Sequence, residues 1–492
     1  MACVVGIDLG TTGNRTIAFS EEGQVLANAY EEFPQIYPQA GWVEHDPVAI
    51  LESTVKTLRS VAENVGSDTI VAIGLTNQRE TTVVWDRETG MPIYNAIVWQ
   101  CRRTTQRCEA LKSQEAAIKR RTGLFVDPYF SATKIEWILD NVQDGRARAE
   151  AGALCFGTID TWILWQLTGG RVHATEPSNA SRTLLMDISE TQFSDDLLDT
   201  FNVPASMLPD VHDSDAMHGC IDSKWIGKDI PVHAILGDQQ ASLFAHAGWR
   251  QGVVKNTYGT GLFLMATTGE HLPESGRLLN TVAWRTGGKA TYAIEGSVFI
   301  GGAAVQWLRD GLELIDDADE TQALAESLDG NDDVYFVPAL SGLGAPYWDP
   351  NARGTIVGLT RQTTRAHLAR ATLEAIAYQS RDVIDAFASV MPDIEFDQLR
   401  VDGGACRNDF LMQFQSDLLQ RPVIRPRILE STALGSAGMA AIACGFWTRE
   451  AFADINGPER VFEPRAAAAD MDALYARWVQ AVDRSRMWKT EP

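Results

Sequence analysis

Residues 4–19 decide the fold, and they read Val4-Val5-Gly6-Ile7-Asp8-Leu9-Gly10-Thr11-Thr12-Gly13-Asn14-Arg15-Thr16-Ile17-Ala18-Phe19. A β-branched, apolar run ends at Asp8, and a second apolar run begins at Thr16. Gly10 and Gly13 lie between the two runs and suit a tight bend, because glycine adopts backbone conformations that other residues avoid. The pattern predicts a β-hairpin with glycine and threonine at its bend.

Strand-like and helix-like segments alternate through the rest of the first half. Residues 70–76 and 81–85 are short apolar runs typical of strands, while residues 47–65 and 104–121 carry the apolar periodicity of helices. Asp46 stands before a proline at the start of the first helix, which suits a cap because proline fits the first helical position. This alternation predicts an α/β fold.

The second half opens with a comparable pattern. An apolar run at 233–236 meets Gly237-Asp238-Gln239-Gln240 and a helical stretch through Ala247. Residues 253–258 and 262–266 then flank the turn Gly259-Thr260-Gly261, as in a second hairpin. Two such hairpins suggest two related halves.

We therefore expect a boundary near residues 245–255, with domains at 1–248 and 249–492. Within the second domain we expect a strand at 399–402, directly before the bend Gly403-Gly404, and helices beyond residue 431. The last of these is an amphipathic helix that begins near residue 466.

The chain has 492 residues, of which 45% are apolar and 22% charged, and its formal net charge is −23. This balance predicts a folded globular protein of two or three domains. Such a charge repels nucleic acid and anionic lipid at long range, so we expect no nucleic-acid partner. We expect no membrane insertion and no signal peptide, because the apolar runs are too short and the N-terminus is not basic. The seven cysteines show no paired spacing, which predicts reduced, mostly buried thiols and a cytoplasmic location.

The familiar phosphate-binding motifs do not fit this sequence. A Walker A motif requires Ser or Thr after its Gly-Lys pair, but the two such pairs continue as Gly227-Lys228-Asp229 and Gly288-Lys289-Ala290. We find neither Gly-x-Gly-x-x-Gly nor a His-Arg-Asp catalytic loop, which disfavours Rossmann and protein-kinase architectures. The three glycine bends remain, and each could cradle phosphate with backbone N–H groups, although a single Gly-Thr turn is usually only a turn.

The three bends, with Asp8 opening the first and Asp238 before the second, resemble the nucleotide-binding elements of the actin-like, ribonuclease-H-like ATPase superfamily. In that fold two α/β domains face each other across a nucleotide and substrate cleft. Further motifs are Asn77-Gln78-Arg79-Glu80-Thr81-Thr82, Trp99-Gln100-Cys101-Arg102-Arg103, Asp127-Pro128-Tyr129-Phe130-Ser131, Gly237-Asp238-Gln239-Gln240, Asn256-Thr257-Tyr258-Gly259-Thr260-Gly261 and Gly342-Leu343-Gly344-Ala345-Pro346-Tyr347-Trp348. The set, which spans residue 8 to about 440, resembles the glycerol kinases of the FGGY family of carbohydrate kinases rather than xylulose or gluconate kinases.

The resemblance implies glycerol catabolism, with the γ-phosphoryl group of ATP transferred to glycerol to give sn-glycerol 3-phosphate and ADP. A three-carbon polyol needs paired polar groups on one side and an apolar surface on the other. Arg79 can donate to two oxygens, and Glu80 can accept from two hydroxyls. The resemblance adds Tyr129, Asp238 and Gln239 as hydroxyl partners, with Asp238 also as the catalytic base. It adds Trp99 and Phe263 as apolar walls.

A Mg²⁺–ATP site is implied as well. Asp8 and Asp238 are the expected anchors for the metal, because Mg²⁺ prefers one or two carboxylates together with phosphate oxygens and water. The residues expected to contact ATP or ADP come from both halves: Thr11, Thr12, Gly13, Arg15, Thr260, Gly302, Gln306, Gly404 and Asn408.

This sequence departs from the family pattern at the first bend. Many relatives read Gln-Gly-Thr-Thr-Ser-Ser-Arg there, whereas this chain has Leu9 for the glutamine and Gly13 for a serine. Contact with phosphate at position 13 would then come from the backbone N–H alone.

Two other interpretations stay open at this point. The substrate could be another short polyol, a ketotriose or a sugar within the same family. The chain could also be a nucleotide-switched binding protein of the actin and heat-shock chaperone type, which the pockets at Arg79-Glu80 and Gly237-Asp238-Gln239 disfavour.

Two further expectations concern assembly and regulation. We expect a homodimer or homotetramer. We also expect weak or absent inhibition by fructose 1,6-bisphosphate, which some bacterial relatives bind through an arginine-containing loop. The corresponding residues 223–230 contain no arginine, and lysine cannot imitate its bidentate geometry.

Overall fold

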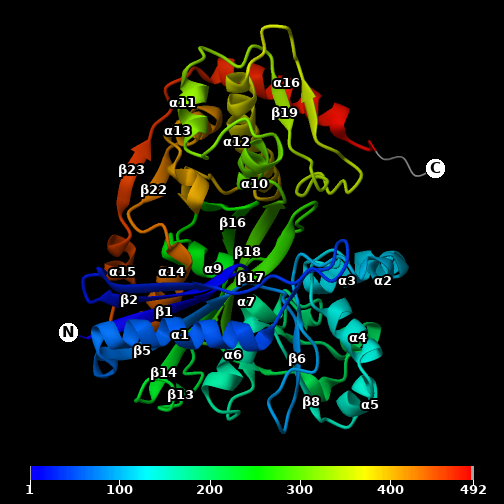
Figure 1. The fold of residues 1–492 in the computed structure, drawn as a ribbon, viewed down its shortest axis with the longest axis vertical. Helices are drawn as coiled ribbons and strands as arrows, with labels where there is room; N and C mark the ends of the chain where they lie inside the picture. The colour runs from blue at the N-terminus through cyan, green and yellow to red at the C-terminus, as the bar shows by residue number, and fades with distance from the viewer. Residues whose placement is uncertain (1, 489–492) are drawn as a thin grey trace.

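The computed structural model describes residues 2–488 and contains two large mixed sheets (Figure 1). The first has six strands in the order β13-β14-β5-β1-β2-β3. Their bounds are β1 (Cys3–Leu9), β2 (Gly13–Ser20), β3 (Val25–Glu32), β5 (Ile70–Asn77), β13 (Cys220–Ile221) and β14 (Ile230–Gly237). Strands β1 and β2 are antiparallel neighbours, which confirms the predicted hairpin, while β5 runs parallel to both β1 and β14.

The second sheet has seven strands in the order β17-β18-β16-β15-β21-β22-β23. Their bounds are β15 (Val253–Tyr258), β16 (Leu262–Gly269), β17 (Leu279–Thr286), β18 (Lys289–Val298), β21 (Gln398–Asp402), β22 (Val423–Pro426) and β23 (Pro458–Phe462). The predicted hairpin is β15 with β16, and β21 lies parallel to β15. Helices follow residue 431 as predicted, and the charged, exposed strand β23, which was not predicted, lies among them and adds to the sheet edge by backbone pairing with β22.

Shorter strands form two-stranded ladders around these sheets. The pairs are β4 (Glu44–His45) with β7 (Ala96–Ile97), β6 (Val83–Asp86) with β8 (Leu154–Gly157), β9 (Ala174–Thr175) with β12 (Asp210–Val211), β10 (Met186–Asp187) with β11 (Gln192–Phe193), and β19 (Tyr335–Val337) with β20 (Thr355–Val357).

Helix α1 has the predicted bounds, Pro47–Val65, and Asp46 caps it by accepting the N–H of Val48 at 2.9 Å. The single helix predicted at 104–121 is instead α2 (Thr105–Ala110) and α3 (Glu115–Thr122), joined by a 3₁₀ turn at Lys112–Gln114. This turn consists of polar, exposed residues, so no apolar side chain holds it against the core as a continuous helix would require.

The other helices are α4 (Ala132–Asn141), α5 (Gly145–Glu150), α6 (Ile159–Leu167), α7 (Pro177–Ala180), α8 (Asp195–Thr200), α9 (Asp238–Ala245), α10 (Gly302–Gln306), α11 (Glu320–Glu326), α12 (Arg365–Val390), α13 (Asp409–Leu419), α14 (Ser431–Ala443), α15 (Arg449–Ile455) and α16 (Ala468–Ser485). The predicted closing helix is α16, which buries Met471 and Trp478.

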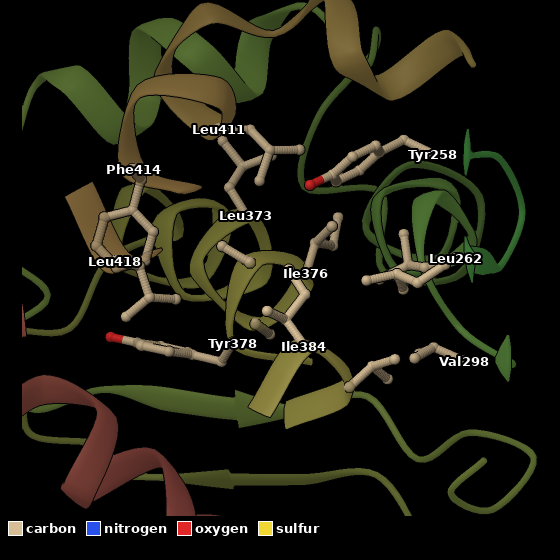
Figure 2. Close-up of a cluster of buried hydrophobic side chains, with 14 of the residues drawn as sticks. Tyr258, Leu262, Val298, Leu373, Ile376, Tyr378, Ile384, Leu411, Phe414 and Leu418 are labelled. Carbon is tan, nitrogen blue, oxygen red and sulfur yellow. The ribbon is translucent and has the colours of Figure 1, made fainter. Parts of the chain in front are cut away.

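The second half has its own core around α12. Figure 2 shows Leu373, Ile376, Tyr378 and Ile384 of this helix among apolar side chains from neighbouring elements. Those neighbours are Tyr258, Leu262 and Val298 from the sheet and Leu411, Phe414 and Leu418 from α13.

Helix α14 lies between β22 and β23 of the second sheet in sequence but packs on the first sheet, against β1, β5 and β14, and against α9 (Figure 1). The domain boundary between residues 248 and 249 stays a prediction. Helix α14 belongs to the second of these domains in sequence but packs on the sheet of the first. All seven cysteines are free, and five of them are buried, as predicted. Among residues 2–488, no helix combines the length and the apolar character needed to cross a membrane.

Candidate active site

Three parallel strands bring predicted site residues to one edge of the first sheet. Asp8 lies near the end of β1, Arg79 follows β5, and Asp238 follows β14. Because β1, β5 and β14 are parallel, their carboxyl ends meet at this edge, where α/β sheets commonly bind ligands. The Nε of Arg79 lies 3.2 Å from the carboxylate of Asp238.

Asp238 is the first residue of α9, and Gly237 occupies the N-cap position. One carboxylate oxygen accepts the N–H of Gln239 at 2.6 Å and faces Arg79, while the other accepts no hydrogen bond from the described residues. Burial raises the pKa of Asp238, and the Arg79 guanidinium opposes that rise. The side chain is 27% exposed, so the carboxylate is held in place and still accessible to a ligand.

Arg79 is buried and makes its bidentate contact within the protein. Nη1 and Nη2 donate to the two carboxylate oxygens of Glu295, at 2.6 and 3.2 Å, and Nη1 also donates to Gln240 at 3.3 Å. The two-oxygen donation that we predicted toward glycerol is thus directed at Glu295.

Glu80 lies in the same buried network. Its Oε1 accepts from Nε of Arg182 at 2.6 Å, and Nη2 of Arg182 donates to Glu295 at 3.1 Å. Arg79, Glu295, Arg182 and Glu80 therefore alternate in charge. Burial opposes ionisation of Glu295, but Arg182 and Arg79 outweigh it and lower its pKa to about 2.

Sequence reasoning missed Glu295 and Arg182. The signal for Glu295 was present, because a carboxylate inside the buried part of strand β18 requires a cationic partner. Nη1 of Arg182 is buried without a partner among the described residues, and its guanidinium lies 5.5 Å from the ring of Tyr129. An unsatisfied buried donor is costly, so this position favours a polar ligand beside Tyr129.

The three predicted aromatic residues form one cluster. The ring of Trp99 lies 5.6 Å from that of Tyr129 and 6.2 Å from that of Phe263, edge to face in both cases. All three line a cavity of about 770 Å³ that Thr260 and Gly261 also line. Tyr129 and Trp99 come from the first half and Phe263 from β16, so the cavity lies between the halves.

Gln239 is held by a lysine that the sequence did not single out. Its side-chain carbonyl accepts a hydrogen bond from Nζ of Lys255, which also donates to Thr257 at 2.8 Å. Burial lowers the pKa of Lys255 to about 8, although Asp402 and Asp238 counteract this effect. Lys255 lies on β15, so the second sheet orients a predicted glycerol residue of the first half.

The first glycine bend, at residues 8–13, contacts the aromatic cluster. Thr11 accepts from the indole N–H of Trp99 at 3.0 Å, and the hydroxyls of Thr12 and Tyr30 are 3.4 Å apart. Arg15 donates to Asn28 at 3.2 Å and lies 4.0 Å from Glu430.

The other two bends meet at the end of β15. The backbone N–H of Gly302 donates to Gly259 at 2.8 Å, which places the start of α10 and its exposed Gln306 beside the second bend. A Cβ on Gly403 would lie 2.5 Å from the carbonyl oxygen of Tyr258, so the bend that contains Gly403 and Gly404 packs closely against the end of β15. Asn408 caps α13 by accepting from Leu411 at 3.0 Å, and its amide donates to Thr321.

The acidic residues fit a divalent cation. Burial and the nearby Asp238 carboxylate raise the pKa of Asp8 to about 7, and Arg15 only partly offsets this rise. Within residues 2–488, no group of three or more His, Cys, Asp or Glu side chains is arranged to hold a metal. A site with at most two carboxylates suits Mg²⁺, which keeps water and phosphate ligands.

Comparison with known proteins gives consistent matches over the whole chain. The models of the FGGY family of carbohydrate kinases match residues 3–245 with the N-terminal domain and residues 254–444 with the C-terminal domain. The chain is 52% identical to glycerol kinase 2 of Thermotoga maritima, over 99% of this chain and 100% of the relative. It is 51% identical to the glycerol kinase of Caldanaerobacter subterraneus subsp. tengcongensis, over 99% of each.

Among solved structures, Plasmodium falciparum glycerol kinase with ADP superposes with a TM-score of 0.92 at 33% identity. The match covers 99% of this chain and 98% of that one. This likeness confirms the predicted fold class of two actin-like α/β domains.

Proposed function

Because this chain belongs to the FGGY family of carbohydrate kinases, we propose that it transfers the γ-phosphoryl group of ATP to glycerol, giving sn-glycerol 3-phosphate and ADP. One observation of the site supports a short polyol as the acceptor. The polar edge at Arg79, Glu80 and Asp238 meets the aromatic cluster at Tyr129, which is close to Arg182 on one side and Trp99 on the other. A short polyol needs these two kinds of surface together.

The residues of the site would have different roles in binding glycerol. Glu80, Gln239 and the Arg182 donor without a partner are available to glycerol hydroxyls, and Arg79 orients Asp238 and Glu295. Trp99 and Phe263 cover the carbon chain. Such fixed positioning supplies much of the rate of a phosphoryl transfer, because it makes the reaction effectively unimolecular.

Asp238 is the proposed general base. Its oxygen without a hydrogen bond takes the proton of the terminal hydroxyl at the sn-3 position as that oxygen bonds to the γ-phosphorus. The bond from the γ-phosphorus to the bridging oxygen then breaks, and ADP carries the electron pair away. Asp8 and Asp238 would hold Mg²⁺, which neutralises phosphate charge when bound.

The nucleotide would lie between the halves. Thr11, Thr12, Gly13 and Arg15 are the proposed contacts of the β- and γ-phosphates. The proposed contacts from the second half, around the phosphates and the adenosine, are Thr260, Gly302, Gln306, Gly404 and Asn408. We also propose a cytoplasmic location, where ATP is available, and a homodimer or homotetramer, which light scattering of the purified protein would test.

A coupled assay of ADP release, with and without glycerol, tests the proposed function. We expect a large rate that depends on glycerol and smaller rates with dihydroxyacetone, erythritol and xylulose. ADP release that ignores glycerol would contradict the kinase proposal. A higher specificity constant, kcat/KM, for one of the other acceptors would contradict glycerol as the substrate.

A further inference from the structure

Tyr30 shares a sheet face with the first glycine bend. In the pairing of β2 with β3, Tyr30 lies directly opposite Arg15, and Gly13 precedes Arg15 by two residues. Alternate residues of a strand point to one face, so Gly13, Arg15 and Tyr30 share theirs. Asn14 points the other way, toward α1, where it donates to Ser53 at 2.7 Å. The face with Tyr30 is therefore the one from which Arg15 approaches Glu430 of the second half.

The hydroxyl of Tyr30 occupies the space over Gly13. A Cβ at position 13 would lie 2.8 Å from the Tyr30 hydroxyl oxygen and 2.6 Å from the carbonyl oxygen of Glu31. The contact with the Glu31 carbonyl would force the backbone to shift, and the contact with Tyr30 would push its side chain away. Glycine at position 13 is therefore what allows the tyrosine hydroxyl to lie against the bend as it does. The bend thus has a hydroxyl at position 13 that comes from the neighbouring strand.

This hydroxyl has unused hydrogen-bonding capacity. A phenolic hydroxyl has one donor and can also accept, and the described contact of Tyr30 is the long one, 3.4 Å, to Thr12. Tyr30 is 43% exposed, so a ligand can reach it. The guanidinium carbon of Arg15 lies 4.9 Å from the tyrosine ring, which places a cation beside the hydroxyl. Either hydroxyl can be the donor in the contact with Thr12, so the Tyr30 hydroxyl can instead donate to a ligand. A cation and such a hydroxyl next to backbone N–H groups suit a phosphate oxygen.

We propose that Tyr30 is a nucleotide-binding residue whose hydroxyl donates to a β- or γ-phosphate oxygen at the first bend. The inference rests on the proposed function, because it requires that a nucleotide phosphate bind there. It assigns to Tyr30 the contact that a side chain at position 13 cannot make.

Binding and kinetics of Tyr30→Phe test this assignment, because the substitution removes the hydroxyl and keeps the ring against Arg15. By calorimetry with Mg²⁺ present, we expect Kd for ADP to rise roughly threefold to tenfold. Kd for AMP should not change, because AMP lacks the β-phosphate. KM for ATP should rise by a similar factor while KM for glycerol and the thermal midpoint stay unchanged. Tyr37→Phe, at a 69% exposed tyrosine outside the bend, is the matched control.

Tyr30→Ala provides a second measurement, because it also removes the ring beside Arg15 and should weaken ADP binding more than Tyr30→Phe does. The inference is overturned if Tyr30→Phe binds ADP within twofold of wild type, or loses AMP and ADP affinity equally. Wild-type protein that binds ADP but shows no glycerol-dependent turnover would end the proposed function and leave this inference standing. The two failures are therefore distinguishable.

Discussion

Asp238 is the proposed proton acceptor, and it is not the N-cap of the helix that it begins. Gly237 occupies the N-cap position of α9. The Asp238 carboxylate faces Arg79 and accepts only the adjacent N–H, so it does not cap the helix. Its ionised form is buried at a cost, as its raised pKa indicates.

We predict that Asp238→Asn keeps the fold and loses the reaction. An amide cannot take the glycerol proton, and loss of a general base costs roughly 10² to 10⁴ in rate, so kcat should fall at least about a hundredfold. Glycerol binding should remain detectable, and the thermal midpoint should not fall. Asp46→Asn is the control, since asparagine caps α1 as well as aspartate does and kcat should not change. A kcat for Asp238→Asn within about threefold of wild type would remove Asp238 from the mechanism.

Asp8 predicts a pH dependence of stability in the protein without nucleotide and metal. Its folded-state pKa of about 7 lies above the ordinary value, so the folded chain binds this proton more tightly than the unfolded chain. The resulting stabilisation is complete below about pH 4 and is lost as the pH rises through about 7. Asp8→Asn cannot lose a proton, and at pH 8 we expect its thermal midpoint to lie about 1–3 °C above wild type.

Calorimetric scans of both proteins between pH 5 and pH 8 measure this difference, which should shrink toward pH 5. Mg²⁺ with ADP should stabilise wild type more than Asp8→Asn, because the ionised carboxylate is the proposed metal ligand. A variant that is less stable than wild type at pH 8 would show that Asp8 is paired in a way the structure does not contain.

At the scale of elements, β18 of the second sheet inserts Glu295 between two arginines of the first half. The side chains of Arg79 and Arg182 are 2% and 0% exposed, and both depend on this carboxylate. We predict that Glu295→Gln destabilises the protein by about 3 kcal/mol in urea unfolding, because it leaves buried positive charge without compensation. KM for glycerol should rise as Arg79 and Glu80 lose their positions.

The control is Glu31→Gln, whose exposed pair with Lys56 should contribute less than about 0.5 kcal/mol. The pKa of Glu295 is lowered, so its contribution is present above its unfolded value and is lost as the pH falls toward 2. A loss of under about 1 kcal/mol at pH 7 would mean that the arginines are satisfied by other groups.

Elements with strong periodicity or turn chemistry could be predicted from the sequence. Elements that form only because a distant strand pairs with them could not. Helix α1 and the hairpin of β1 and β2 have local signals, and both were predicted. The exposed edge strand β23 has no apolar alternation and exists because β22 offers it a partner, so it was missed. In the site, motif residues were found, whereas Lys255, Arg182 and Glu295 required knowledge of which strands and loops meet.

The loop before β14 carries our prediction on regulation. Its backbone is held to helix α1, since Arg59 donates to the carbonyl of Trp225 at 2.9 Å. Within the loop, Asp229 accepts the N–H of Ser223 at 2.7 Å. Lys228 donates to the carbonyl of Asp68 at 3.2 Å, so one of the loop's two lysines is already engaged. We expect fructose 1,6-bisphosphate at low millimolar concentration to lower the initial rate by less than half, against a sulfate control of equal ionic strength. Saturable inhibition beyond half would show that this loop, or another site, binds the bisphosphate.

At the scale of the whole molecule, α14 of the second half is in backbone contact with elements of the first half. A Cβ on Gly6 would lie 2.1 Å from the carbonyl oxygen of Ala433, and a Cβ on Gly435 would lie 1.8 Å from that of Ala241. Backbone therefore touches backbone where β1 and α9 of the first half meet this helix of the second. Glu430, which faces Arg15, directly precedes α14, so the position of this helix also sets one side of the first glycine bend.

Gly74→Ala tests whether this contact holds the two halves together. A Cβ on Gly74 would lie 2.0 Å from the carbonyl oxygen of Ser436, and backbone on both sides cannot yield as a flexible side chain would. Helix α14 must then move off β5, and overpacking of this kind costs about 1–3 kcal/mol or more. Gly330→Ala is the matched control, because its φ is not in the left-handed region and the nearest atom to its Cβ would be the Asp332 nitrogen, at 4.0 Å. We expect a lower thermal midpoint and a raised KM for ATP in Gly74→Ala alone, since a shifted α14 carries Glu430 away from Arg15. If Gly74→Ala has the same thermal midpoint and the same KM for ATP as Gly330→Ala, then α14 adapts to the sheet. In that case α14 does not fix the two halves relative to each other.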